Sequence, residues 1–153
     1  MKMKALLQRV KKSQVTINGK IISKIDQGYN ILLGVAGDDS EKDADILAEK
    51  IVNLRVMSDE EDKMNRSILD SKGSILVVSQ FTLMADVTSG RRPSFIKAAG
   101  ADKARALYEY FVGKLKTLGI SDVQKGEFGA YMDVEIVNDG PVTIMLDTRE
   151  LKN

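Results

Sequence analysis

The fold is indicated first by the segment Val15-Thr16-Ile17-Asn18-Gly19-Lys20-Ile21-Ile22-Ser23-Lys24-Ile25. Apolar Val15 and Ile17 alternate with polar neighbours, which is the period of a half-buried strand. Asn18-Gly19 is the dipeptide that two-residue hairpin turns favour, because both positions need positive φ angles. Residues 21–25 supply the return strand, so the sequence predicts an antiparallel hairpin here.

Further strands are expected on both sides of this hairpin. Residues 1–36 as a whole favour strands, and residues 30–36 form a run typical of a buried strand. Residues 74–81 form another β-rich run. Near the end of the chain, residues 131–137 and 142–146 are expected to be two strands joined by a turn through Asn138-Asp139-Gly140-Pro141.

Two helices are expected between these strands, at residues 40–57 and 102–118, because both segments repeat apolar residues at helical spacing. Ser40 followed by Asp43 favours a capping box at the start of the first helix. Residues 58–73 and 84–94 are expected to be loops. We therefore predict one α+β domain, residues 1–153, with a mainly antiparallel or mixed, barrel-like sheet and two principal helices.

The composition narrows the chemistry available to this chain. Its 153 residues include no cysteine and no histidine. This excludes disulfides, thiolate and imidazole metal ligands, and Cys-His or Ser-His-Asp nucleophiles. The carboxylates show no spacing typical of a metal site, so we expect neither a metal nor another cofactor. An enzyme of this sequence works without the side chains most often used for proton transfer near neutral pH.

Two further expectations concern location and partners. No apolar run reaches about 18 residues, and the apolar stretch near the N-terminus is too short for a signal peptide, so we expect a cytoplasmic protein with no membrane partner. The net charge is only +1, but residues 1–24 carry seven basic and no acidic residues, whereas residues 38–62 carry ten acidic and three basic residues. Such a division permits one positive face that binds a polyanion, and it is equally compatible with an ordinary solvated charged surface.

Two segments carry polar or constrained residues where an ordinary core would not need them. Ser79-Gln80-Phe81-Thr82-Leu83 ends a predicted buried strand, where free backbone N–H groups can bind an oxyanion. The alternative is a strand end whose polar groups satisfy one another. Asn138-Asp139-Gly140-Pro141-Val142-Thr143 is turn chemistry, and the isomer of its Gly-Pro bond is open from sequence alone.

Two more segments allow two interpretations each, one of which is contact with a nucleotide. Gly126-Glu127-Phe128-Gly129-Ala130-Tyr131-Met132 places glycines around an aromatic ring, which permits close approach of a flat base, or else it is the glycine-rich start of a core strand. Gly90-Arg91-Arg92-Pro93-Ser94-Phe95 offers paired arginines suited to phosphate, or else it is a solvated turn.

Taken in order along nearly the whole chain, these segments resemble the D-aminoacyl-tRNA deacylase family, formerly called D-tyrosyl-tRNA deacylase. The match also includes three short segments outside those described above. The segments that carry the resemblance are Gln8-Arg9-Val10, Lys63-Met64-Asn65, residues 75–83, residues 90–95, Leu107-Tyr108-Glu109, residues 128–132 and residues 138–143.

The resemblance implies a homodimer that hydrolyses the ester between a D-amino acid and the terminal adenosine of tRNA, with its active sites at the subunit interface. It implies a cis Gly140-Pro141 bond that reaches into the neighbouring subunit's site, with Arg9 holding this loop. We expect no DNA partner. The remaining implied site residues are Ser79, Gln80, Phe81 and Thr82 at the reaction centre, and Phe128, Gly129, Ala130 and Met132 around the adenine.

This function agrees with a chain that lacks histidine and cysteine. An aminoacyl ester is already activated, so placement of the ester, a water molecule and an oxyanion site is expected to suffice. The backbone amides of Phe81 and Thr82 are the expected oxyanion donors, and the ribose 2′-hydroxyl is expected to assist the water. Thr82 has no evident base to activate it, so we expect it to position rather than attack.

Three alternatives stay open at this point. One is a related editing deacylase for other mischarged tRNAs, although the intact Ser79-Gln80-Phe81 segment argues against it. Another is a tRNA-binding dimer without catalysis, which the missing histidine and cysteine and the divided charge would also suit. The third is an α+β domain with no ligand.

Overall fold

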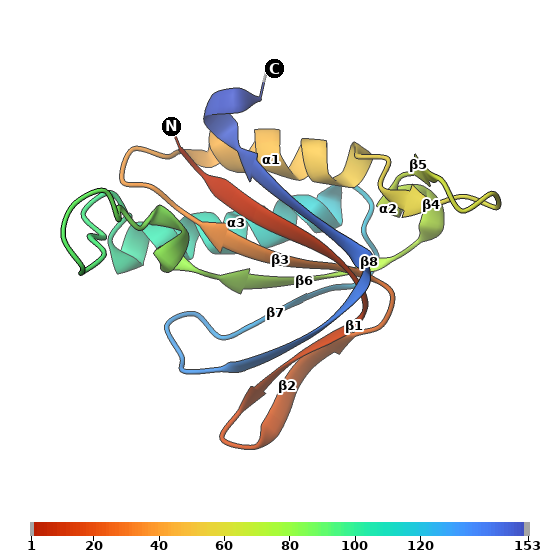
Figure 1. The fold of residues 1–153 in the computed structure, drawn as a ribbon, viewed down its shortest axis with the longest axis horizontal. Helices are drawn as coiled ribbons and strands as arrows, with labels where there is room; N and C mark the ends of the chain where they lie inside the picture. The colour runs from red at the N-terminus through yellow and green to blue at the C-terminus, as the bar shows by residue number, and fades with distance from the viewer. Residues whose placement is uncertain (1, 152–153) are drawn as a thin grey trace.

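A computed structural model of the chain describes residues 2–151; residues 1, 152 and 153, the outermost positions of the predicted domain, lie outside the described residues. The α+β class is confirmed, with α1 and α3 as the two principal helices (Figure 1). In chain order the elements are β1 (Lys4–Ile17), β2 (Lys20–Ile25), β3 (Gly28–Gly34), α1 (Glu41–Asn53), β4 (Met57–Ser58), β5 (Met64–Arg66), α2 (Ile68–Ser71), β6 (Ser74–Ser79), the 3₁₀ turn η1 (Phe81–Met84), α3 (Ala101–Thr117), β7 (Val123–Lys125), β8 (Asp133–Asp147) and the 3₁₀ turn η2 (Thr148–Glu150).

One mixed, six-stranded sheet forms the body of the molecule. Its order is β2-β1-β3-β6-β7, and β8 pairs with β1 as well. β1 runs antiparallel to β2, β3 and β8, whereas β3–β6 and β6–β7 are parallel pairs. The sheet curls until β2 lies beside β6 and β7, so it is nearly closed into a barrel.

Two apolar cores hold this sheet. The larger core lies where α1 and α3, packed against each other, cover one face of the sheet (Figure 1). The smaller core fills the inside of the curled part. Its buried members are Val10, Val15, Ile25, Leu76 and Val78.

The predicted hairpin is confirmed. Ile17 pairs with Lys20, and the two turn residues, Asn18 and Gly19, have φ angles of 50° and 77°. Such angles are those of a tight hairpin turn, which asparagine and glycine adopt with the least strain. The local sequence therefore determined this part of the sheet.

The two helices are confirmed, with one end in error. The N–H of Ser40 donates to the Asp43 carboxylate at 2.9 Å, as the capping box predicted. α1 ends at Asn53 rather than residue 57, because Leu54 takes an extended backbone (φ −59°, ψ 137°). α3 differs from the prediction by one residue at each end.

The predicted loop over residues 58–73 is wrong, because it holds β4, β5 and α2. The Asp59 carboxylate accepts from the N–H groups of Glu61 and Lys63, which closes the turn between the two short strands. Ser67 caps α2 by accepting from the N–H of Asp70 at 3.1 Å. Elements of two to four residues carry no measurable period, so the pattern missed them. The prediction also named no counterpart of β7.

The two strands expected at residues 131–137 and 142–146 are one continuous strand, β8. Both halves pair with β1, as Val15↔Val134 and Leu6↔Met145 show. The register shifts between them, so the segment around Gly140 is a bulge and not a hairpin turn. The β-rich run at 74–81 likewise ends at Ser79, and the chain continues into η1.

Candidate active site

A pocket of about 230 Å³ lies where the end of β6, the start of α3 and the segment after β7 meet. It brings together part of the predicted reaction centre and part of the predicted adenine segment. The pocket is lined by Val35, Ser79, Phe81, Ala99, Ala101, Ala104, Phe128 and Gly129. Its lining is therefore mainly apolar, with a strand end on one side, as expected for a small-molecule site.

The geometry of η1 follows from how β6 ends. The N–H of Gln80 donates to the carbonyl of Leu33 at 2.8 Å, which carries the pairing with β3 one residue past the strand. The first hydrogen bond of the turn then runs from the N–H of Leu83 to the carbonyl of Gln80, at 3.2 Å. The amides of Phe81 and Thr82 precede this bond, so the turn itself does not use them.

The Thr82 hydroxyl accepts a hydrogen bond from the side-chain amide of Gln80. Thr82 is exposed. An amide donor orients a hydroxyl but cannot take its proton, so this contact is one of positioning. Gln80 and Thr82 thus flank the pocket without lining it.

Phe81 connects the pocket to the loop that carries the two arginines. Its ring meets the ring of Phe95 edge-on, with 4.9 Å between centroids. The loop is closed by a pair of backbone hydrogen bonds between Asp86 and Ser94, at 2.8 and 2.9 Å. Hydrogen bonds from the Thr88 side chain and backbone lower the pKa of the Asp86 carboxyl, which stays charged in the folded loop.

Tyr108 fixes the opposite wall of the pocket. Its hydroxyl donates to the carbonyls of Val77, at 2.8 Å, and Gly126, at 3.3 Å, and so ties β6 to the segment that leads to Phe128. Burial raises the pKa of this hydroxyl, which keeps it a donor. Its ring also meets the Phe128 ring at a centroid distance of 6.0 Å. The sequence analysis gave Tyr108 no role, although the residue lies in one of the segments that carry the family resemblance and a buried tyrosine on a helix needs a hydrogen-bond partner.

Two members of the predicted adenine segment do not line the pocket. The N–H of Ala130 donates to the carbonyl of Glu127 at 3.2 Å, closing the turn in which Gly129 has a φ of 77°. Met132 packs instead against the smaller core. A Cβ on Gly126 would lie 2.9 Å from the Met132 sulfur, so the glycine permits this packing.

Arg9 and Gly140-Pro141 form a second cluster. The Gly140-Pro141 bond is cis, and Gly140 has a φ of 118°. Arg9 is 8% exposed; its Nη1 donates to the carbonyl of Val56 at 2.7 Å and its Nε to the carbonyl of Asp139 at 3.1 Å. The Asp139 carboxylate lies 3.7 Å from the same Nε. A Cβ on Gly140 would lie 2.9 Å from Arg9 Nη2, so the two residues are packed directly together.

This second cluster lies away from the pocket within one chain. Arg9 pairs with Tyr29 on β3, whereas Ser79 pairs with Leu33 on the same strand. Four residues along β3 amount to about 13 Å at ~3.3 Å per residue. One chain therefore presents the predicted site residues as two separate groups.

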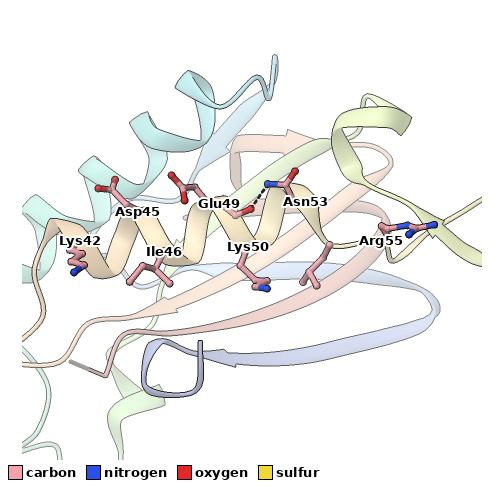
Figure 2. Close-up of a pocket in the computed structure, with 8 residues that line it drawn as sticks. Lys42, Asp45, Ile46, Glu49, Lys50, Asn53 and Arg55 are labelled. Carbon is pink, nitrogen blue, oxygen red and sulfur yellow. Dashed lines mark hydrogen bonds between the residues drawn. The ribbon is translucent and has the colours of Figure 1, made fainter. Parts of the chain in front are cut away.

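A larger recess, of about 630 Å³, runs along α1 (Figure 2). Lys42, Ile46 and Lys50 extend from one side of the helix there, and Asp45 and Glu49 from the other (Figure 2). Its charges are of both signs, and none of the predicted site residues lines it. We therefore place the candidate site in the smaller pocket.

Comparison with known proteins identifies the family. A model of the family described as D-Tyr-tRNA(Tyr) deacylase matches residues 6–147. The chain belongs to this family. The D-aminoacyl-tRNA deacylase of Clostridium kluyveri is 51% identical over 97% of this chain and 99% of its own length. That of Dictyoglomus turgidum is 54% identical over 98% of this chain and 96% of its own.

Solved structures also match the fold of this chain. One is described as "c-Myc DNA Unwinding Element Binding Protein" and has a TM-score of 0.89 at 42% identity, covering 94% of this chain and 97% of its own. Another, described as a probable eukaryotic D-amino acid tRNA deacylase, has a TM-score of 0.84 at 19% identity, covering 96% of this chain and 100% of its own, and bears on the fold alone. The absence of a DNA partner stays a prediction for this deacylase.

Two further observations concern membrane-spanning helices and metal-binding groups. Among residues 2–151, no helix is both long and apolar enough to cross a membrane. The same part of the chain holds no group of three or more Asp or Glu residues that could bind a metal ion.

Proposed function

We propose that this deacylase hydrolyses the ester bond of D-aminoacyl-tRNA and of glycyl-tRNA in the cytoplasm, and spares L-aminoacyl-tRNA. The observation that carries the proposal is the pocket shared by Ser79, Phe81, Phe128 and Gly129 in a member of this family. The pocket offers an apolar surface for a base. It lies beside the end of β6, where the 3₁₀ turn η1 does not use the backbone amides of Phe81 and Thr82.

The chemistry follows from placement. With the adenine against Phe128, the ester carbonyl lies toward η1, where the amides of Phe81 and Thr82 stabilise the negative charge that develops on the carbonyl oxygen. A water molecule attacks, and the 2′-hydroxyl of the substrate assists it. Removing one oxyanion donor from an enzyme typically costs ~10²–10³ in kcat, which is the scale we assign to each amide.

Rejection of L-residues is assigned to the second cluster, supplied by a second copy of the chain. Arg9 and Asp139 hold the loop that presents the carbonyls of Gly140 and Pro141. In the dimer these carbonyls accept from the substrate ammonium and leave no room for an L side chain. Thousandfold selectivity needs about 4 kcal/mol, so the loop must be rigid. Glycine has no side chain to exclude and is therefore cleaved.

Apolar side chains around the pocket support a homodimer. Phe81 lines the pocket and is 56% exposed, and Ile96, which follows its ring partner Phe95 in the chain, is 86% exposed; large apolar groups gathered in this way mark a surface that a partner can cover. The separation between Arg9 and Ser79 points the same way, since a second copy is what can bring the two clusters together.

The primary test is hydrolysis of D-tyrosyl-tRNA, L-tyrosyl-tRNA and glycyl-tRNA at matched enzyme concentration. Loss of the D-tyrosyl and glycyl esters with the L-tyrosyl ester spared is the expected result. Equal loss of all three would mean an unselective esterase and would remove the role of Gly140-Pro141. Saturable binding of tRNA with no hydrolysis would favour the tRNA-binding dimer instead.

The shared site is tested by mixing two damaged variants. Phe128→Ala alters the pocket, and Gly140→Ala alters the loop, because its methyl group meets Arg9. Each homodimer is expected to lose activity or selectivity. Mixed dimers regain one intact site each, so co-folding equal amounts should restore about a quarter of the sites. No recovery, with mixed dimers demonstrated by two affinity tags, would mean that each chain builds its site alone.

A further inference from the structure

α3 places an arginine at the rim of the pocket. Ala101 and Ala104 line the pocket, and residues at i, i+3 and i+4 share one side of a helix. Arg105, four residues after Ala101, is therefore on the flank of α3 that faces the pocket. It is exposed to solvent.

The side chain of Arg105 is held against the pocket wall. Its guanidinium carbon lies 5.0 Å from the centroid of the Phe128 ring, and the same ring also contacts the buried Tyr108. A contact between a cation and the ring uses none of the five guanidinium N–H donors. The guanidinium group is thus placed beside Phe128 with its N–H donors still available.

Nearby cations are engaged elsewhere, and Arg105 is not. Lys103 Nζ donates to the Gly37 carbonyl at 2.6 Å, Lys125 pairs with Glu109 at 2.7 Å, and Lys97 lies 3.5 Å from the Asp86 carboxylate. Within residues 2–151, Arg105 makes no ion pair and no hydrogen bond.

We propose that Arg105 binds the phosphate that joins the terminal adenosine of the tRNA to the preceding nucleotide. The inference rests on the proposed function, which places the adenine against Phe128 and the ester at η1. The phosphate on the 5′ side of that ribose then leaves the apolar pocket at its rim. Arginine is the side chain best suited to phosphate oxygens, because its planar N–H groups match two of them at once.

Two possible roles of Arg105, binding the phosphate and holding the Phe128 ring, can be distinguished with substrates that have or lack this phosphate. We would measure kcat and KM of wild type and Arg105→Ala with D-tyrosyl-tRNA and with the D-tyrosyl ester of adenosine, which has no phosphate. Arg105→Ala is expected to raise KM for the tRNA about tenfold or more and to leave the adenosine ester unchanged. Arg105→Lys keeps the charge but not the planar pair of donors, so it should recover part of the loss.

The salt dependence and a matched control complete the test. Loss of one phosphate contact should lower the slope of log KM against log salt concentration by about 0.7. Lys116→Ala removes another exposed cation from α3, one that lines a different recess, and should change neither substrate. Equal losses with both substrates would assign Arg105 to holding Phe128 and overturn the proposal, as would no loss with either.

Binding of product-like ligands distinguishes this proposal from the proposed function. Wild type should bind the dinucleotide CpA more tightly than adenosine, and Arg105→Ala should remove most of that difference. If no ester is hydrolysed but this difference is found, the catalytic function fails and the phosphate site stands. If hydrolysis occurs and wild type binds both ligands equally, the phosphate site fails alone.

Discussion

Gly34 sets the position of η1, and its replacement by alanine gives the sharpest test of the site. A Cβ at Gly34 would lie 2.9 Å from the Leu83 Cβ, 3.2 Å from the Gln80 carbonyl oxygen and 2.8 Å from the end of the Met84 side chain. Met84 can swing aside, but the other two atoms belong to the backbone or are fixed to it. Gly34→Ala therefore pushes η1 away from β3.

The expected losses in kcat and in stability follow from these distances. Ordinary contact begins at 3.4 Å, so Leu83 must retreat from 2.9 Å, a shift of about 0.5 Å that the amides of Phe81 and Thr82 share. A displacement of ~1 Å in an active site costs ~10²-fold in rate, so we expect about tenfold in kcat. Overpacking typically costs ~1–3 kcal/mol of stability, or a few degrees in melting temperature for a chain of this size.

The assay is single-turnover hydrolysis of D-tyrosyl-tRNA together with thermal unfolding, using Gly113→Ala as the matched control. A Cβ at Gly113 meets nothing within 4 Å, and alanine inside a helix should raise stability by about 0.5–1 kcal/mol without changing the rate. Lowered stability with an unchanged rate in Gly34→Ala would show that the position of η1 does not govern catalysis. Unchanged stability would refute the packing argument itself.

Three further predictions concern single side chains. Thr82→Ala should keep kcat within about tenfold, because the hydroxyl positions and does not attack; loss of nearly all turnover with intact folding and tRNA binding would contradict this. Tyr108→Phe should lower the free energy of unfolding in urea by about 0.5–1.5 kcal/mol through loss of its hydrogen bonds to two carbonyls, and an unchanged transition midpoint would show that they contribute nothing. The pKa of Asp86 is lowered by hydrogen bonds from Thr88, so its contribution to stability is present above its unfolded pKa of about 4 and is lost as pH falls through the lower folded value. The difference in melting temperature between wild type and Asp86→Asn should therefore shrink from pH 6 to pH 3, and a constant difference would argue against that linkage.

Local chemistry was predictable because the residues that determine it are close in the chain. Asn18-Gly19 fixes its hairpin through its own φ angles, and Ser40 with Asp43 caps α1 across three residues. The α+β class and the order of the family's segments likewise follow from short stretches of the chain. The end of α1 was not predictable from a short stretch, because Leu54 leaves the helix to reach β4.

The site itself depends on long-range pairing. The sequence around Gly140 has the composition of a hairpin turn, yet β1 pairs with the residues on both sides of it and so makes it a bulge in one strand. No local pattern records which strand will be the partner, since that choice depends on the burial of the whole sheet.

Short segments of the chain were enough to predict the α+β class and the family and to nominate the residues of the candidate site, because the signals that they carry are local. The folded chain adds that Ser79 and Phe128 line one pocket and that Tyr108 donates to carbonyls on two of its walls. It also places Arg9, with Gly140 packed against it, beside Tyr29 of β3, about 13 Å along that strand from the partner of Ser79. These relations join elements far apart in the chain, and the packing of α3 and the pairing of β1 bring them into their positions.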